Sequence, residues 1–257
     1  MRLLEVARSP RVSRGTRRWI ASVALLALLF SPRASLAEDT APGEKTISGA
    51  ERARWFEEDR ERQKGVGGLS AAVVQRKRDP LLKNEVVSRG KLSFRKPDSL
   101  RWEVESPEQR IVVMDGRTVT TYYPKRKEAE RRDMRDDFGT RAALGLFESG
   151  ISPSLPELER RFHVDLFRSH DEVVLRLIPR SKMLSRSIAS IRIHQDPVDG
   201  ILRRIVVEGT RGDRTETTFS GVTLNPDFPP GTFTLPLGAE VRVTETGGAA
   251  QTRVDAP

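Results

Sequence analysis

Residues 88–124 constrain the fold more than any other part of the chain, because apolar and polar side chains alternate there over several short runs. Leu92 and Phe94 alternate with Lys, Ser and Arg, and Leu100 and Trp102 alternate with Arg and Glu. A period of two places one set of side chains on a buried face of a β-sheet and the other set in water. The pattern therefore predicts strands of a sheet with one apolar face.

Turn signals separate these runs. Pro97-Asp98 and Ser106-Pro107 break the alternation, and Asp115-Gly116 is a strong signal for a short hairpin. Pro124 ends the last run. The stretch is therefore predicted to be a meander of antiparallel strands.

The remainder of the sequence predicts more strands and few helices. Apolar stripes at helical spacing predict helices over residues 50–64, 138–148 and 155–162. Alternating runs between residues 164 and 222 predict further strands, for a total of roughly ten or eleven. The densely charged segment 125–135 is predicted to be an exposed hairpin or an edge strand that its charges protect from pairing.

The predicted fold class is mainly β with α (α+β): a curved antiparallel half-open β-barrel that is covered by short helices and encloses an apolar cavity. A sheet of this many strands must curl, split or close. Two short internal helices and the N-terminal helix supply too few side chains to fill a closed barrel tightly. A well-packed core without a cavity is the alternative.

The N-terminal segment has the layout of a secretory signal peptide. Arg residues precede a twelve-residue apolar run from Trp19 to Phe30, and small residues follow it up to Ala37. The run is shorter than the ~20 residues that span a bilayer, so we expect export to the periplasm and cleavage after Ala37. An uncleaved anchor and a twin-arginine export route stay open as alternatives. The expected divisions are a signal peptide at 1–37, a disordered spacer at 38–49, one domain at 50–245 and a disordered tail at 246–257.

The formal net charge of +9 belongs mostly to this N-terminal segment. Residues 1–37 contain seven Arg and one Glu, so the other 220 residues carry a net charge of +3. A nucleic-acid-binding function therefore lacks its main electrostatic support, whereas a weaker contact with an anionic membrane surface stays open.

The sequence contains no constellation typical of catalysis or metal binding. It has no Cys, and His163, His170 and His194 do not share a helix face at metal-ligand spacing. Ser93 and Lys96 match S-x-x-K as text, but side chains three positions apart in a strand point to opposite sides. We expect no enzyme, no metal and no cofactor, and we expect the three His to be solvated or at a sheet edge.

Apolar side chains on the inward face of the predicted strands and helices are the candidate lining of the apolar cavity. Each of them is equally compatible with an ordinary core position. The candidates are Leu92, Phe94, Leu100, Trp102, Leu144, Phe147, Leu175, Leu177, Ile191, Ile193, Ile205, Val207 and Phe219.

Arg101 is the one polar candidate. It lies between Leu100 and Trp102 in a predicted strand, so its side chain is expected on the face opposite Trp102. An exposed strand Arg that pairs with Glu103 or with an acid on a neighbouring strand is one interpretation. The other is a latch that donates several hydrogen bonds to a helix end or a loop, for which the planar guanidinium is suited.

The order and spacing of motifs in residues 88–124 resemble the LolA family of periplasmic lipoprotein carriers. Weaker similarity continues at residues 177–180 and in the C-terminal segment 217–241. The matching positions are Ser88, Gly90, Leu92, Phe94, Lys96-Pro97, Leu100 to Glu103, Pro107, Ile111-Val112, Asp115-Gly116 and Tyr123-Pro124.

The resemblance implies an unclosed β-barrel with a helical cover and an apolar cavity. It also implies a carrier that takes the acyl chains of lipoproteins from an inner-membrane transporter and delivers them to an outer-membrane acceptor. Arg101 matches the family's Arg in its R-W motif, so the resemblance implies a role in holding the lid closed. The sequence departs from the family at Gly212 to Thr215, where a glycine-glutamine element is expected, and at the charged segment 125–135.

The leading hypothesis is therefore a monomeric periplasmic carrier of lipoproteins or of another acylated lipid. The alternative is a lipid-sensing regulatory module of the same half-barrel fold, which would bind a membrane signalling protein. A periplasmic hydrolase is the third reading, but it would need a clustered acid–base pair that the sequence does not show.

Overall fold

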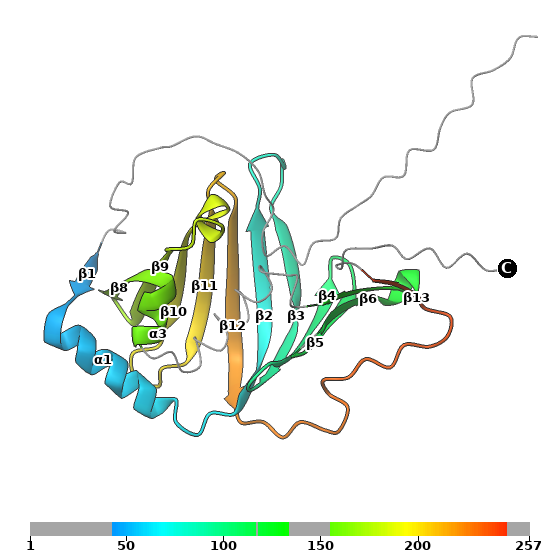
Figure 1. The fold of residues 1–257 in the computed structure, drawn as a ribbon, viewed down its shortest axis with the longest axis horizontal. Helices are drawn as coiled ribbons and strands as arrows, with labels where there is room; N and C mark the ends of the chain where they lie inside the picture. Colours follow the sequence, from blue (N-terminus) through cyan, green and yellow to red (C-terminus); the bar gives the residue numbers. More distant parts are fainter. Residues whose placement is uncertain (1–42, 117, 134–154, 246–257) are drawn as a thin grey trace, which may run out of the picture.

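The computed structural model describes residues 43–116, 118–133 and 155–245. They form one mixed sheet of thirteen strands with the order β1-β8-β9-β10-β11-β12-β2-β3-β4-β5-β6-β7-β13. Since the order begins at β1 and ends at β13, the sheet is open, and Figure 1 shows that it is strongly curved. This architecture confirms the predicted mainly β fold with an unclosed curved sheet.

The elements follow one another along the chain with short connections. The strands are β1 (Glu44–Ile47), β2 (Gly68–Arg78), β3 (Val86–Arg95), β4 (Ser99–Ser106), β5 (Arg110–Asp115), β6 (Thr118–Tyr123), β7 (Glu128–Asp133), β8 (Phe162–Ser169), β9 (Glu172–Pro179), β10 (Ile188–Gln195), β11 (Leu202–Gly209), β12 (Arg214–Leu224) and β13 (Arg242–Glu245). The helices are α1 (Gly49–Arg62) and α3 (Leu155–Arg161), with 3-10 turns η1 (Pro124–Arg126) and η2 (Leu184–Arg186).

The predicted meander over residues 88–124 is the run from β3 to β6. Each of these strands pairs antiparallel with the next, and Gly116 adopts a positive φ of 84° in the turn after Asp115, where glycine is favoured. Leu92 pairs with Trp102, and Trp102 pairs with Val112, so the apolar set of each strand lies on the same face. The period-two pattern therefore predicted both the strands and their orientation.

One face of the sheet packs against the helices, and we call it the inner face. Trp55 and Phe56 of α1 and Leu158 of α3 belong to the same buried cluster as Leu92 and Leu175 of the strands. Figure 1 shows α3 in front of β8, β9 and β10. The opposite side of the sheet is the outer face.

Two predictions about the chain's organisation need correction, and a third is not tested. The expected spacer at 38–49 contains β1, because residues 44–47 pair with β8 and Ile47 is buried. The charged segment near 125–135 is not an edge, since β7 has β6 on one side and β13 in parallel on the other. The predicted helix at 138–148 lies outside the described residues.

A buried polar cluster fixes the C-terminal end of α1 to the turn between β10 and β11. Asp59 is only 2% exposed and its carboxylate lies 3.4 Å from Arg62. The side-chain amides of Gln63 and Gln195 both donate to the carbonyl of Gly200. Burial raises the pKa of Asp59, although Arg62 acts in the opposite direction. The charged carboxylate is therefore less favourable here than in water.

We expect the stability of the chain relative to an Asp59→Asn variant to rise as the pH falls. A carboxyl whose pKa is raised on folding binds its proton more tightly in the folded state, so folding gains free energy as the pH falls through the raised pKa toward the ordinary value. The amide of the variant has no such dependence. Urea unfolding of both proteins at neutral and mildly acidic pH measures the difference. If the difference moved in the opposite direction, burial would not dominate the environment of Asp59.

Candidate functional site

The inner face is continuously apolar across the middle of the sheet. Two cross-strand rows run over β2 to β5, and they place side chains from separate strands next to one another. The first row is Ala71, Leu92, Trp102 and Val112, and the second is Leu69, Phe94, Leu100 and Met114. Apolar and polar side chains alternate within each strand, and each row joins side chains from four strands. The apolar surface therefore depends on the pairing register as well as on composition.

All the described candidates for the cavity lining lie in this single apolar cluster. Nine of them are buried in it, and Trp102 and Val207 are partly buried and pack against it. The nine are Leu92, Phe94, Leu100, Leu175, Leu177, Ile191, Ile193, Ile205 and Phe219. Leu144 and Phe147 lie outside the described residues. The structure thus brings the described candidates together, while their role as a lipid lining stays a prediction.

Sequence reasoning missed several members of the same cluster. Val73, Val112 and Met114 are buried on the inner face, and Trp55 and Phe56 contribute from α1. The alternation within residues 111–114 was too short to show which side chains point inward. Pairing of β5 with β4 settles the question, since Val112 lies opposite Trp102.

Polar side chains also reach the inner face. The guanidinium of Arg110 lies over the ring of Trp102, 5.7 Å from its centroid. Burial lowers the pKa of Arg110, and its Nε and the Nε1 of Trp102 have no hydrogen-bond partner among the described residues. Farther along the face, the amide of Gln75 donates to the hydroxyl of Thr217. Two unsatisfied donors therefore lie close together within an apolar surface.

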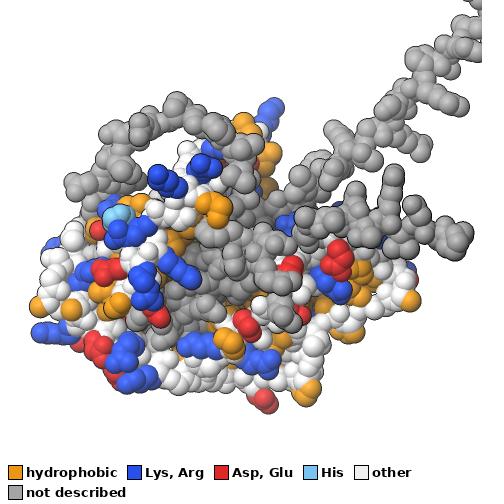
Figure 2. Space-filling view, in the orientation of Figure 1, with side chains coloured by type: hydrophobic (Ala, Val, Ile, Leu, Met, Phe, Trp, Pro, Cys, Tyr) orange, Lys and Arg blue, Asp and Glu red, His pale blue; other side chains and the backbone are white. Residues whose placement is uncertain are grey.

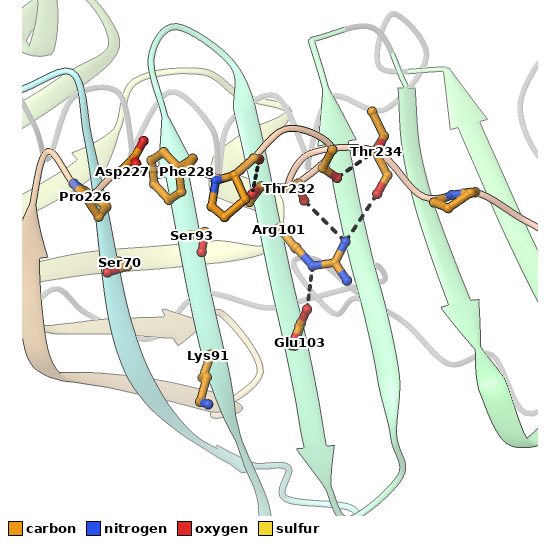
Figure 3. A pocket seen from close by; sticks show the side chains of 13 residues that line it. Ser70, Lys91, Ser93, Arg101, Glu103, Pro226, Asp227, Phe228, Thr232 and Thr234 are labelled. Carbon is orange, nitrogen blue, oxygen red and sulfur yellow. Dashed lines mark hydrogen bonds and ion pairs between the residues drawn. The ribbon is translucent and has the colours of Figure 1, made fainter.

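Arg101 lies on the outer face, opposite the inner-face rows. Its Nε donates to the carboxylate of Glu103 at 2.5 Å, and its Nη1 donates to the carbonyls of Thr232 and Thr234 at 3.3 Å each (Figure 3). Arg101 therefore makes both the ion pair with Glu103 and the hydrogen bonds to a loop that were considered as separate interpretations. The bonds join β4 to the segment after β12 and not to α1 or α3, so a contact with the predicted helix at 138–148 stays a prediction.

The segment that receives these bonds, residues 225–241, crosses the outer face, and we call it the strap. It starts beside β2 and ends where β13 joins β7, so it passes β3, β4, β5 and β6 (Figure 1). Asn225 holds its start, since its side chain accepts from the amides of Gly67 and Gly68 and donates to Gly65. The sequence pattern did not predict that this segment crosses the sheet.

Aromatic contacts seat the middle of the strap on the sheet. The rings of Phe228 and Phe233 meet edge to face with their centroids 5.0 Å apart, and Phe233 is buried. The guanidinium of Arg95 lies 4.6 Å from the ring centroid of Phe233. Such contacts are typical of a segment that is packed onto a surface and not free in solution.

A groove of about 820 Å³ lies between the strap and the outer face. Ser70, Ser93 and Arg101 line its floor, and Figure 3 shows Phe228 and Thr232 above them from the strap. A smaller gap near the end of α1 is bordered by Val66 and other residues. Neither space is lined by any of the apolar candidates, so an enclosed apolar cavity on the inner face stays a prediction.

The three His are not arranged as a catalytic or metal centre. His163 and His170 are exposed as predicted, but His194 is buried, so its predicted solvated position is wrong. Its Nδ1 lies 2.7 Å from Glu172 and 3.1 Å from the guanidinium of Arg204, and burial lowers its pKa. Among the described residues, no group of three or more His, Asp or Glu could hold a metal ion.

The helices of the described part of the chain are all too short or too polar to cross a membrane. The protein-family model for outer membrane lipoprotein carrier protein LolA matches residues 64–236. An outer-membrane lipoprotein carrier protein from Bordetella avium is 26% identical over 182 residues, which cover 70% of this chain and 80% of the relative. One from Chromohalobacter salexigens is 27% identical over 154 residues, which cover 59% and 69%.

Solved structures resemble the chain less closely. A LolA superfamily protein from Nitrosomonas europaea has a TM-score of 0.39 at 14% identity, over 71% of this chain and 97% of that one. An uncharacterized conserved protein from Thermus thermophilus has a TM-score of 0.46 at 13% identity, over 76% and 99%. Scores at this level add no argument about function. The match over residues 64–236 covers more than half of the chain, which therefore belongs to the LolA family of outer membrane lipoprotein carrier proteins.

Proposed function

We propose that this protein is a periplasmic carrier that shields the acyl chains of lipoproteins, or of another acylated lipid, against the inner face of its sheet. The observation that carries this proposal is the continuous apolar inner face of an unclosed sheet, in a chain of the LolA family. The carrier names of the Bordetella and Chromohalobacter relatives support lipoproteins as the cargo. The proposed role is binding and transport without catalysis.

The energetics of acyl chains explain why such a carrier is needed. Each CH₂ group that leaves a lipid phase for water costs about 0.8 kcal/mol, so a free acyl chain crosses an aqueous compartment extremely slowly. An apolar surface made of Leu, Ile, Val and Phe side chains offsets this cost without selecting one chain length or chemical type. Broad acceptance of acylated cargo follows from this composition.

The unsatisfied donors of Arg110 and Trp102 give the surface one polar position. A buried donor without a partner is unfavourable by about 1–3 kcal/mol, so a ligand that supplies an acceptor is favoured there. Ester and amide carbonyls, which join acyl chains to lipids and to lipoproteins, are acceptors of this kind. We place the carbonyl end of the cargo beside Arg110 and its acyl chain along the rows of Leu92 and Phe94.

The remaining elements of the proposal concern transport. Export with cleavage after Ala37 would deliver the domain to the periplasm as a monomer. An inner-membrane transporter is the proposed donor of the cargo, and an outer-membrane component is the proposed acceptor. Release requires the cover of the inner face to open, which is a population shift that contact with either partner can drive.

The chain purified from the periplasm without detergent is expected to contain acylated material in near-stoichiometric amount. Extraction with organic solvent, followed by lipid and intact-mass spectrometry, measures the amount and names the class of cargo. A lipid-free protein that also ignores added lipoprotein and phospholipid would overturn the proposal, and the inner-face residues would then be plain core.

A matched pair of substitutions in β5 tests the inner face directly. Val112 and Val113 are adjacent and similarly buried, at 4% and 5% exposure, but Val112 belongs to the inner-face row and Val113 pairs with Arg101 on the outer face. Asn at either position destabilises the fold to a similar degree because it buries an amide. Val112→Asn is expected to lower lipid affinity by about tenfold while Val113→Asn leaves it near the original value. Equal loss in both variants would argue against binding at the inner face.

Arg101→Leu is expected to loosen the strap, because the change removes the hydrogen bonds to Thr232 and Thr234. Amide hydrogen exchange over residues 226–241 should rise by about tenfold. Arg76→Leu is the control, since Arg76 is an exposed strand Arg that pairs with Glu85 away from the strap. Unchanged amide exchange in the Arg101→Leu variant would contradict a role of Arg101 in holding the strap.

The lipid content of the same Arg101→Leu variant tests the proposed lid latch separately, since loss of a lid latch is expected to leave more lipid bound.

A further inference from the structure

Three connections meet at one end of the sheet and form a continuous surface, which we call the basic rim. They are the β2–β3 tip (79–85), the β9–β10 connection with η2 (180–187) and the β11–β12 turn (210–213). Figure 1 shows all three at its upper edge. The amide of Thr210 donates to the carbonyl of Ser187 at 3.0 Å, and its hydroxyl donates to that of Arg186 at 2.8 Å. The rim is therefore a connected surface and not three independent loops.

The tip of the β2–β3 hairpin touches the rest of the rim and has a defined shape. Pro80 lies beside Gly212, since its Cγ is 3.5 Å from the place that a Cβ of Gly212 would occupy. The carboxylate of Asp79 accepts from the amide of Leu81, and the carbonyl of Asp79 accepts from the amide of Leu82. The turn thus holds both leucines in their outward positions.

The basic rim exposes large apolar side chains that the fold does not use. Leu81 is 91% exposed, Leu82 is 53% exposed and Met183 is 54% exposed. A folded chain seldom places two adjacent leucines and a methionine in water on neighbouring loops without a binding role. Figure 2 shows hydrophobic and basic side chains side by side at this end of the molecule.

The charges of the rim are predominantly positive. Lys83, Lys182, Arg186 and Arg211 are exposed, and none of them forms an ion pair with a described residue. Of the three acids in the rim, Asp79 caps the turn and Glu85 pairs with Arg76, so Asp213 is the acid that offsets part of the positive charge. Two of the three apolar side chains have one of these cations next to them in sequence: Lys83 follows Leu82, and Lys182 precedes Met183.

We propose that the basic rim docks on the surface of a bilayer that contains anionic phospholipids. Leu81, Leu82 and Met183 would enter the boundary between headgroups and acyl chains, while the neighbouring cations bind phosphate groups. A projecting hairpin tip suits insertion between lipid headgroups. The long Lys and Arg side chains of the whole rim can adjust to a mobile array of phosphates. This proposal does not depend on the cargo proposed above, because the rim lies outside the inner face.

Docking in this way would bring the inner face close to the membrane. Val86 lies at the start of β3 on the same face as Leu92, and it is 39% exposed. Between Val86 and Leu92 the same face carries Ser88 and Gly90, and Gln75 lies opposite Ser88, so a short stretch with polar side chains separates the rim from the apolar rows.

Cosedimentation with lipid vesicles tests the proposal on the exported, purified chain. We expect binding to vesicles of phosphatidylcholine mixed with phosphatidylglycerol, little binding to phosphatidylcholine alone, and weaker binding at high salt. Leu81→Ser combined with Leu82→Ser should lower the partition coefficient by about tenfold, as should Lys83→Glu combined with Lys182→Glu. Circular dichroism melting is expected to be unchanged in both, because these side chains are exposed.

Val198→Ser is the matched control. Val198 is 83% exposed at the opposite end of the sheet, but its turn contains Asp196 and Asp199, which pair with Arg203. This variant should bind vesicles like the unchanged protein. Absence of vesicle binding by the unchanged protein, or equal binding by the rim variants, would overturn the proposal even if lipid is found on the inner face. Equal binding to neutral vesicles would also overturn it, because the cations would then have no role.

Discussion

The need to cover one apolar face of an open sheet is the constraint on which the rest of this structure depends. An open sheet cannot bury that face against itself, so other elements must lie on it. Helix α1 does so with Trp55 and Phe56, and two polar attachments fix its position. Near its start, Arg52 donates to Glu159 and to the carbonyl of Val164. Near its end, the cluster around Asp59 holds it to the β10–β11 turn. Polar attachment near both ends and apolar contact between them hold α1 over the sheet.

The outer face carries both polar and apolar side chains, such as Arg101 and the buried Val113, and a long segment of chain crosses it. The strap must cross from β12 in the middle of the sheet to β7 near its edge, since β13 pairs in parallel with β7. Arg101 supplies bonds at the midpoint of this path, and Asn225 and the Phe228–Phe233 pair hold its first half. The strap thereby connects β4, which carries Trp102 on the inner face, to the far edge of the sheet.

The two faces and the basic rim divide the molecule into surfaces with different chemistry. The inner face is largely apolar and is proposed to hold acyl chains, the outer face is mixed and packed by the strap, and the rim combines exposed leucines with cations that form no ion pair within the described part of the chain. Carrying lipid and touching a membrane have different requirements, because the first needs shelter from water and the second needs exposure to it. Separate surfaces allow both in one domain.

Local pattern alone predicted the strands from β3 to β6, the Asp115-Gly116 hairpin, and the facing of Leu92, Phe94, Leu100 and Trp102. These features depend on the period of two within a strand and on turns between sequence neighbours. Only the tertiary structure decided that Arg101 binds Thr232 and Thr234, that His194 is buried, and that β1 pairs with β8 and β13 with β7. Each joins segments far apart in the chain: Thr232 is 131 residues from Arg101. Side-chain periodicity shows which way a residue points from its own strand, but it carries no information about which distant segment will be brought against it.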